Sequence, residues 1–255
     1  MKWALCLSGQ ARFVKESFDD IKYHIIDVVK PDIYIHTWHE DTSDLGIDYN
    51  ALISLYKPKH CIIEKQIEFD TDVDTLEILD FHEWNKDQLR WMYKRVASMF
   101  YSASMSSRKV MEDNYYDFII KCRTDLLPTQ DIMIDNLDKE TLYCHMMPLH
   151  LAGYNSTNEY EKRYSCKRFF GDQIAYGSYE VMRKYFDIYW HFEYGIIKTG
   201  RLNAGSVLSY YLNKESRIKN FQSNSFLDST QDRIFRNGSH RLLLNSLNSG
   251  AIPNY

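Results

Sequence analysis

Residues 3–38, "WALCLSGQARFVKESFDDIKYHIIDVVKPDIYIHTW", indicate the architecture of this chain more clearly than any other segment. The apolar run at 3–7 has the length of a buried strand. From residue 13 to residue 29, apolar side chains recur at three- and four-residue steps, which is the period of one helix face. Pro31 ends that pattern, and residues 32–38 are typical of a second strand. Strand, helix and strand in this order predict a parallel α/β unit.

The same alternation continues towards the middle of the chain. A short helix is predicted over residues 48–56 and a strand over 60–65. A long helix follows over residues 87–113, and its apolar stripe predicts one buried face. Strands are then predicted over residues 117–127 and 141–146. Three strands separated by helices form a Rossmann-like opening, in which the sheet is parallel.

The last third of the chain is less clearly patterned. Helices are predicted over residues 179–193 and 203–214, and a strand near 218–222, whereas residues 150–168 are polar and carry no period. The length of 255 residues suits one large α/β domain with ample material for a core. We therefore expect an α/β fold with a central, mostly parallel sheet flanked by helices.

Composition and charge exclude several classes of partner. The net charge is −4, so no basic field favours nucleic acid. No apolar run is long enough to span a bilayer, and the opening "MKWALCLSG" lacks the features of a signal peptide. The five cysteines include no closely spaced pair, which favours free thiols in a reducing compartment over a zinc site. These features predict a cytoplasmic protein without a membrane span.

The first candidate site is "SGQAR", residues 8–12, after the first predicted strand. Ligands of parallel α/β sheets bind beyond the carboxyl ends of the strands. Gly9 allows a ligand to approach the backbone closely, and the following helix offers free N–H groups to an anion. Arg12 adds donors for a phosphate, while Ser8 and Gln10 make the turn chemically rich. The alternative is an ordinary strand-to-helix turn.

The second candidate site is "CRTD", at the end of the strand that follows the long helix. Arg123 and Asp125 are two positions apart, so they share one face of an extended chain. Asp125 has the hard oxygen ligands that a divalent cation requires, and Arg123 can neutralise a phosphate directly. The alternative is a structural Arg–Asp pair, or an Asp125 that caps the next turn.

Two further residues are weaker candidates. Asp172 follows Gly171 in "FFGDQIAYGS", which we expect to be a turn before a helix, and a carboxylate in a partly apolar turn can act as a general base. A turn-capping role is the alternative. His36 lies near the end of the second strand, where it can touch a nucleotide or serve as a buried structural histidine.

Taken in order, these segments resemble GT-A-type glycosyltransferases found in polysaccharide gene clusters and in large DNA viruses and phages. The resemblance covers roughly residues 1–215 and rests on "LSGQAR", "DIYIHTW", "RWMYKRVASMFYSA", "YYDFIIKCRTDLL" and "FFGDQIAYGSYEVMRKY". It implies one domain over residues 1–255. The first half, 1–126, binds the nucleotide, and residues 127–255 form the acceptor-side half and a C-terminal tail.

The resemblance also implies a reaction. In GT-A enzymes a D-x-D motif ends the strand after a long helix and holds Mn²⁺ or Mg²⁺ against the donor's diphosphate. "RTD" occupies that place here, so Asp125 matches the final carboxylate, while Arg123 departs from the motif and can do part of the cation's work. The implied function is transfer of a sugar from a nucleotide-sugar donor to a glycan, a glycoprotein or another hydroxyl acceptor. The implied location is the cytoplasm, which is the host's if a virus encodes the chain.

Roles for the candidate residues follow from this resemblance. The donor-binding set is Ser8, Gly9, Gln10, Arg12, His36, Arg123 and Asp125. In an inverting enzyme Asp172 would deprotonate the acceptor hydroxyl, whereas a retaining enzyme would not need that base. Two alternatives remain, a catalytically silent relative that binds a nucleotide or glycan, and a sulfotransferase. The absence of lysine from "SGQAR" argues against the sulfotransferase.

Overall fold

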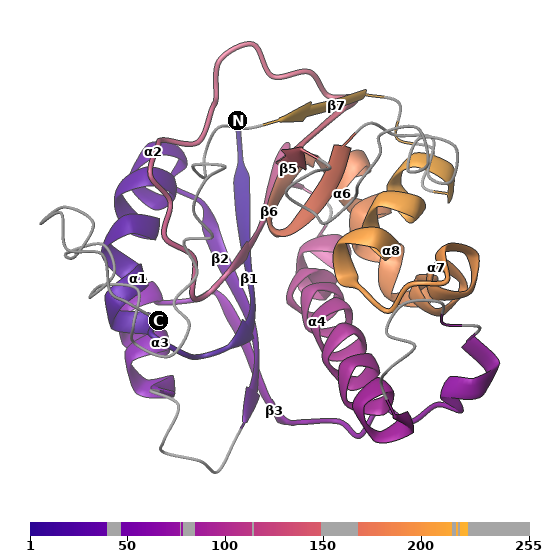
Figure 1. Cartoon of the computed structure of the whole chain (residues 1–255). Helices are drawn as coiled ribbons and strands as arrows, with labels where there is room; N and C mark the ends of the chain where they lie inside the picture. The colour runs from indigo at the N-terminus through magenta and orange to yellow at the C-terminus, as the bar shows by residue number, and fades with distance from the viewer. Residues whose placement is uncertain are drawn as a thin grey trace, which may run out of the picture.

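A seven-stranded sheet lies between two layers of helices (Figure 1). The structure is a computed structural model and describes residues 1–39, 47–76, 78, 85–113, 115–148, 168–215, 218 and 220–223. The strand order is β3-β2-β1-β4-β6-β5-β7, and every strand except β6 runs in the same direction. The predicted α/β class with a mostly parallel central sheet is therefore confirmed.

The first four strands form a wholly parallel half of the sheet. They are β1 (Trp3–Gln10), β2 (Asp32–His39), β3 (His60–Lys65) and β4 (Phe118–Arg123). The chain moves outward from β1 to β3 and then returns to place β4 on the other side of β1. The strand order thus reverses between β1 and β4. Ligands of open α/β sheets bind beyond the carboxyl ends of the strands at such a reversal.

The rest of the sheet contains β5 (Thr141–Pro148), β6 (Arg168–Ser178) and β7 (Asn220–Ser223). The expectation that Asp172 stands in a turn after Gly171 is wrong, because both residues belong to β6, which is antiparallel to both β4 and β5. Ile174 and Tyr176 pack into the core on one side of the sheet and Ala175 into the core on the other. A strand that is buried on both faces lacks the alternation that identifies strands in a sequence.

Most helices agree closely with the predicted periodicity, but the helix predicted over 179–193 is two helices joined by a 3₁₀ turn at Asp187–Trp190. The helices are α1 (Val14–Ile21), α2 (Asp27–Val29), α3 (Tyr49–Tyr56), α4 (Lys86–Asp113), α6 (Tyr179–Phe186), α7 (Phe192–Thr199) and α8 (Ala204–Tyr210). A π-helical turn joins α1 to α2, so the predicted helix over 13–29 is continuous in position but irregular in the middle. Among the described residues, no helix is long and apolar enough to cross a membrane.

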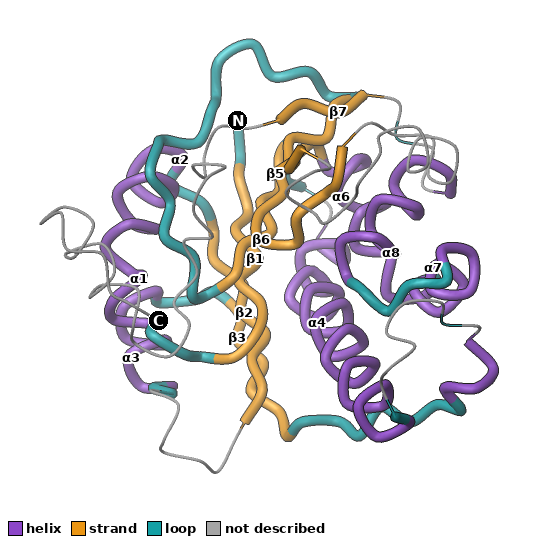
Figure 2. Tube along the Cα trace, viewed as in Figure 1, coloured by secondary structure: helices purple, strands orange, loops and turns teal. Residues whose placement is uncertain are grey.

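The two faces of the sheet carry different helices (Figures 1 and 2). Helices α1, α2 and α3 lie on one side, and α4, α6, α7 and α8 on the other. Alternate residues of β1 feed the two cores. Leu5 and Leu7 pack on the α1 side, whereas Ala4 and Cys6 pack on the α4 side. This alternation is the direct result of the strand's two-residue period.

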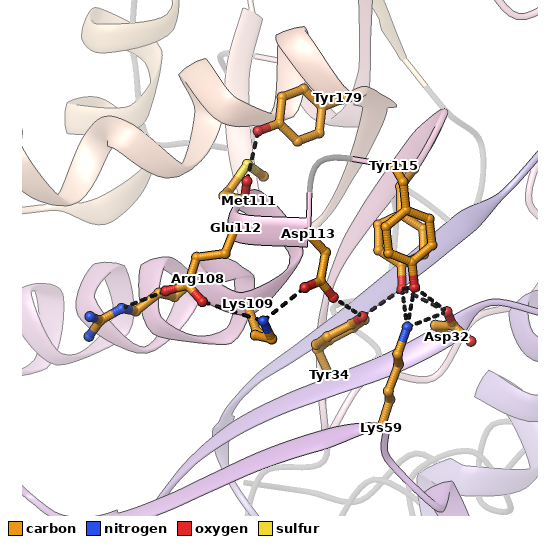
Figure 3. A network of polar contacts seen from close by, with 11 residues as sticks. Asp32, Tyr34, Lys59, Arg108, Lys109, Met111, Glu112, Asp113, Tyr115 and Tyr179 are labelled. Carbon is orange, nitrogen blue, oxygen red and sulfur yellow. Dashed lines mark hydrogen bonds and ion pairs between the residues drawn. The ribbon is translucent and has the colours of Figure 1, made fainter.

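A polar network at the amino-terminal edge of the sheet fixes the end of α4 (Figure 3). The Tyr34 hydroxyl lies 2.5 Å from that of Tyr116 and donates to Asp113 at 3.3 Å. Tyr116 in turn donates to Asp32 at 2.6 Å, and Lys59 donates to the same carboxylate at 3.1 Å. These contacts join β2, the start of β3 and the end of α4. They fix one end of the helix whose middle passes the carboxyl end of β1.

Candidate functional site

The carboxyl end of β1 has an unusual backbone. β1 continues through Gln10, so Ser8, Gly9 and Gln10 belong to the strand rather than to the predicted turn. Gly9 has a φ of 114°, which side chains other than glycine rarely adopt. A Cβ atom built on Gly9 would meet no atom of the described residues within 4 Å, and the Gly9 N–H donates to Ser102 Oγ on α4 at 2.9 Å. The strand therefore ends beside open space, which a ligand can enter.

The ends of β1 and β4 are tied directly to each other. The Thr124 hydroxyl, just after β4, donates to the Gln10 carbonyl at 2.6 Å, and the Arg12 N–H donates to the same oxygen at 2.8 Å. Ser17 Oγ on α1 donates to the Thr124 carbonyl at 2.6 Å. Ser8 lies opposite both His36 and Arg123 in the strand register. The turn after each strand is thus held by the other strand and by α1.

Arg123, Asp125 and Arg12 form one compact ionic group at these strand ends. Arg123 donates to Asp125 twice, from Nε to Oδ1 and from Nη2 to Oδ2, each at 2.8 Å. Arg12 Nη2 lies 3.4 Å from the same Oδ2. Asp125 is only 2% exposed. A buried carboxylate therefore holds two guanidinium groups, one from the end of β4 and one from the segment just after β1.

The pKa values of this group are shifted in the directions that its geometry requires. Burial alone would raise the pKa of Asp125, but the charge and hydrogen bonds of Arg123, together with Arg12, hold it below its ordinary value. Burial alone would lower the pKa of Arg123, but Asp125 and Asp172 outweigh burial and raise it above its ordinary value. Both side chains of the pair are therefore charged at neutral pH.

Lys121 and Asp172 extend the group towards β6. Lys121 is fully buried on β4, and its Nζ donates to the backbone carbonyl of Asp172. Burial lowers the pKa of Lys121 to about 8, although the Asp172 charge opposes that shift. Arg123 Nη1 lies 3.6 Å from Asp172 Oδ2. Lys121 was not among the residues predicted from the sequence, although a lysine inside an apolar strand was a usable signal because lysine is rarely buried.

The charges of this group do not balance. Among the described residues, the cations are Arg12, Lys121 and Arg123, and the carboxylates are Asp125 and Asp172. Two of the donors also lack a good acceptor there. Arg12 Nε is buried without a hydrogen-bond partner in the described part of the chain, and the 3.6 Å contact of Arg123 Nη1 is longer than a hydrogen bond. An anion at this edge would supply both the missing charge and the missing acceptors.

A divalent cation fits these side chains poorly. Both oxygens of Asp125 already accept from guanidinium groups, and two adjacent cations repel a third. No cluster of three His, Cys, Asp or Glu side chains suited to a metal occurs within the described residues. As these side chains lie, they do not form a site for Mn²⁺ or Mg²⁺. The metal ion inferred at Asp125 stays a prediction.

His36 lies behind the strand end rather than at it. Its side chain is fully buried, with Nε2 2.7 Å from Glu64 Oε1 and Nδ1 2.8 Å from Ser102 Oγ. Both ring nitrogens are therefore engaged in hydrogen bonds. A bound nucleotide-sugar could be influenced by His36 only through Ser102. Burial lowers the pKa of His36 below its ordinary value, while Glu64 opposes that shift.

The structure thus brings together most of the residues predicted for the site. Gly9, Gln10, Arg12, Arg123 and Asp125 meet at the reversal of the strand order, and Asp172 joins them from β6. Residues 149–167, which include most of the unpatterned segment, and residues 224–255 lie outside the described residues. The chain matches no protein family in a scan of family models, and no curated protein matches it.

Proposed function

We propose that this protein is a GT-A-type glycosyltransferase that moves a sugar from a nucleotide-sugar donor to a hydroxyl group of a glycan or glycoprotein. The supporting observation is the excess of positive charge at the carboxyl ends of β1 and β4, where, among the described residues, Arg12, Lys121 and Arg123 meet two carboxylates. A leaving diphosphate develops negative charge as the glycosidic bond breaks. Fixed cations lower the energy of that transition state.

In this proposal Arg12 and Arg123 bind the diphosphate. Asp125 engages two donors on one edge of the Arg123 guanidinium, Nε and Nη2, so Nη1 is left to face the ligand. The open space beside Gly9 lets a phosphate approach the end of β1. A guanidinium that is already held in place loses little freedom when it binds, which favours affinity. The arrangement neutralises the diphosphate with this chain's own side chains.

Asp172 is the proposed base that takes the proton from the acceptor hydroxyl. Its carboxylate lies 3.6 Å from Arg123 Nη1, which is the donor that the diphosphate would use. Binding of the diphosphate therefore competes with Asp172 for Arg123 and releases the carboxylate. An inverting reaction needs its base and its leaving group on opposite faces of the sugar. Asp172 can therefore act as the base only after its carboxylate has been released from Arg123, which binds the leaving group.

Ligand-dependent thermal stability tests the proposal. We expect UDP-, GDP-, dTDP- or CMP-sugars to raise the unfolding temperature, and a ligand at 100 times its Kd adds about 2.7 kcal/mol of stability. The matching nucleosides without phosphates are the control, because the anion site should not recognise them. If no nucleotide diphosphate or nucleotide-sugar stabilises the protein, the proposal is wrong.

A second measurement separates an enzyme from a silent binding protein. Wild-type protein with the stabilising nucleotide-sugar should release free nucleotide, slowly with water and faster with an acceptor. Binding without any release, across a panel of acceptors, would support the alternative of a catalytically silent relative. Stabilisation by adenosine 3′,5′-bisphosphate alone would support a sulfotransferase instead.

A further inference from the structure

A chain of hydrogen bonds crosses four elements and ends on the backbone of Gly9. Glu64 on β3 lies 2.7 Å from His36 Nε2 on β2. His36 Nδ1 lies 2.8 Å from Ser102 Oγ on α4. Ser102 Oγ accepts the N–H of Gly9 on β1 at 2.9 Å. Gly9 is the residue whose positive φ opens the strand end beside the ionic group.

The partners assign the direction of every bond in this chain. A carboxylate only accepts, so His36 Nε2 carries the proton that it donates to Glu64. A neutral imidazole then has Nδ1 free to accept, and the Ser102 hydroxyl donates to it. The Ser102 oxygen keeps its lone pairs for the Gly9 N–H. The protonation state of His36 thus determines which way the Ser102 hydroxyl points.

We propose that His36 is a positioning residue, which holds the Gly9 backbone through Ser102 and so couples its own protonation to the strand end. The functional part of this inference, weaker binding of donor phosphates when the chain is broken, rests on the proposed function. The structural part does not, because it concerns Gly9 in the free protein.

The surroundings of His36 make such coupling physically reasonable. The titratable groups placed against it are Glu64 on β3 and Tyr101 on α4, whose ring centroid is 5.6 Å from the imidazole. Burial keeps His36 neutral at neutral pH by lowering its pKa, against the opposing effect of Glu64. When acid protonates Nδ1, this nitrogen becomes a donor, and the Ser102 hydroxyl must turn to the His36 carbonyl at 3.3 Å. The Gly9 N–H then shares the Ser102 oxygen with a cationic donor.

The Gly9 amide signal is the direct test. Protein labelled with ¹³C-carbonyl serine and ¹⁵N-glycine gives signals only from Ser–Gly pairs, which are Ser8–Gly9 and Ser249–Gly250. A Ser249→Ala variant identifies the Gly9 signal. We expect this signal to titrate in one step below the ordinary range of histidine, in parallel with the His36 ring signals. It should exchange its hydrogen faster in Ser102→Ala, where the amide loses its acceptor.

Ser106→Ala is the matched control. Ser106 lies one turn further along the same helix, is buried, and donates only within the helix, to the Ala103 carbonyl at 2.7 Å. This variant should leave both the titration and the exchange of Gly9 unchanged. The proposal is overturned if Gly9 does not titrate with His36, or if its titration persists unchanged in Ser102→Ala. His36→Gln, which removes the titrating group, should abolish the step if it folds.

Nucleotide affinity tests the functional part separately. Loss of one hydrogen bond in the chain should weaken binding of a nucleoside diphosphate about two- to tenfold in Ser102→Ala, and not in Ser106→Ala. Equal affinities of wild type and Ser102→Ala would overturn the functional part. A wild type that binds no nucleotide contradicts the proposed function itself, whereas the Gly9 signal still decides whether the chain operates.

Discussion

Arg123 and Asp125 lie two residues apart at the end of β4, and two hydrogen bonds of 2.8 Å join them side by side. Asp125 is buried, and it engages the Nε and Nη2 donors of the Arg123 guanidinium while Nη1 faces Asp172. The buried carboxylate just after β4 therefore holds the arginine in one orientation. We propose that this orientation serves an anionic ligand.

Removal of the carboxylate should destabilise the fold. Asp125→Asn leaves Arg123 and Arg12 without their shared counter-charge, and breaking a buried ion pair costs about 3–5 kcal/mol. Urea unfolding measures the loss. The control is Asp87→Asn, an exposed aspartate 3.5 Å from Arg90, which should change stability very little. Similar losses in both variants would contradict the structural importance of Asp125.

Arginine geometry should matter more than positive charge. Arg123→Lys keeps the charge but loses the planar fork that Asp125 aligns, so affinity for a nucleoside diphosphate should fall about 10- to 100-fold. Isothermal titration calorimetry gives the comparison. Arg183→Lys, which alters an exposed arginine on α6, provides the control. Wild-type affinity in Arg123→Lys would mean that Arg123 does not contact the ligand.

Chelation distinguishes arginine from a metal ion as the partner of the diphosphate. Because both Asp125 oxygens are engaged by guanidinium groups, we expect EDTA to leave nucleotide affinity unchanged. The measurement is a titration of nucleotide in EDTA, followed by one in excess Mn²⁺ or Mg²⁺. A large gain with either cation would instead support the metal site that the D-x-D resemblance implies.

Lys121 should give the fold a measurable dependence on alkaline pH. Burial lowers its folded-state pKa to about 8 from an ordinary value of 10.5. Between these values the unfolded chain binds a proton that the folded chain has lost, so the stability contribution of this residue rises with pH. The rise is up to about 3 kcal/mol. The free energy of unfolding should be measured for wild type and for Lys121→Met across this pH range. We expect the difference between the two proteins to change with pH.

If the difference in free energy of unfolding between wild type and Lys121→Met stays constant across that pH range, Lys121 titrates normally. That result would contradict the burial of the Lys121 ammonium group, because burial is the cause of the lowered pKa. The comparison with Lys121→Met cancels the titration of the other lysines and the tyrosines, which are common to both proteins.

Asp172 should affect turnover rather than donor binding. If it is the base, Asp172→Asn should lower the rate of sugar transfer by about 10²- to 10⁴-fold. Donor affinity should be equal or higher, because the diphosphate no longer competes with a carboxylate for Arg123. Steady-state kinetics with a fixed acceptor separates the two effects. An unchanged transfer rate would assign Asp172 to positioning Arg123 alone.

Local patterns in the sequence were sufficient to predict the α/β class and most elements. The apolar runs of β1 to β4 and the periodicity around Ile21, Leu52 and Val96 are properties of neighbouring residues, and these side chains are buried as that periodicity requires. β6 was missed because it is buried on both faces and lacks alternation. The ends of the strands were less certain, as β1 includes Ser8 to Gln10.

The composition of the site was also visible in the sequence, but its ionic pairing was not. Gly9, Arg12 and Arg123 were identified because glycine and arginine at strand ends are chemically unusual. The sequence by itself determined the fold class and the edge of the sheet at which these residues gather. Only the tertiary structure decided that Asp125 is buried between two arginines, that His36 lies behind the strand end, and that Lys121 contributes a buried charge. The physical reason is that burial and charge pairing depend on contacts between residues far apart in the chain, which no local pattern records.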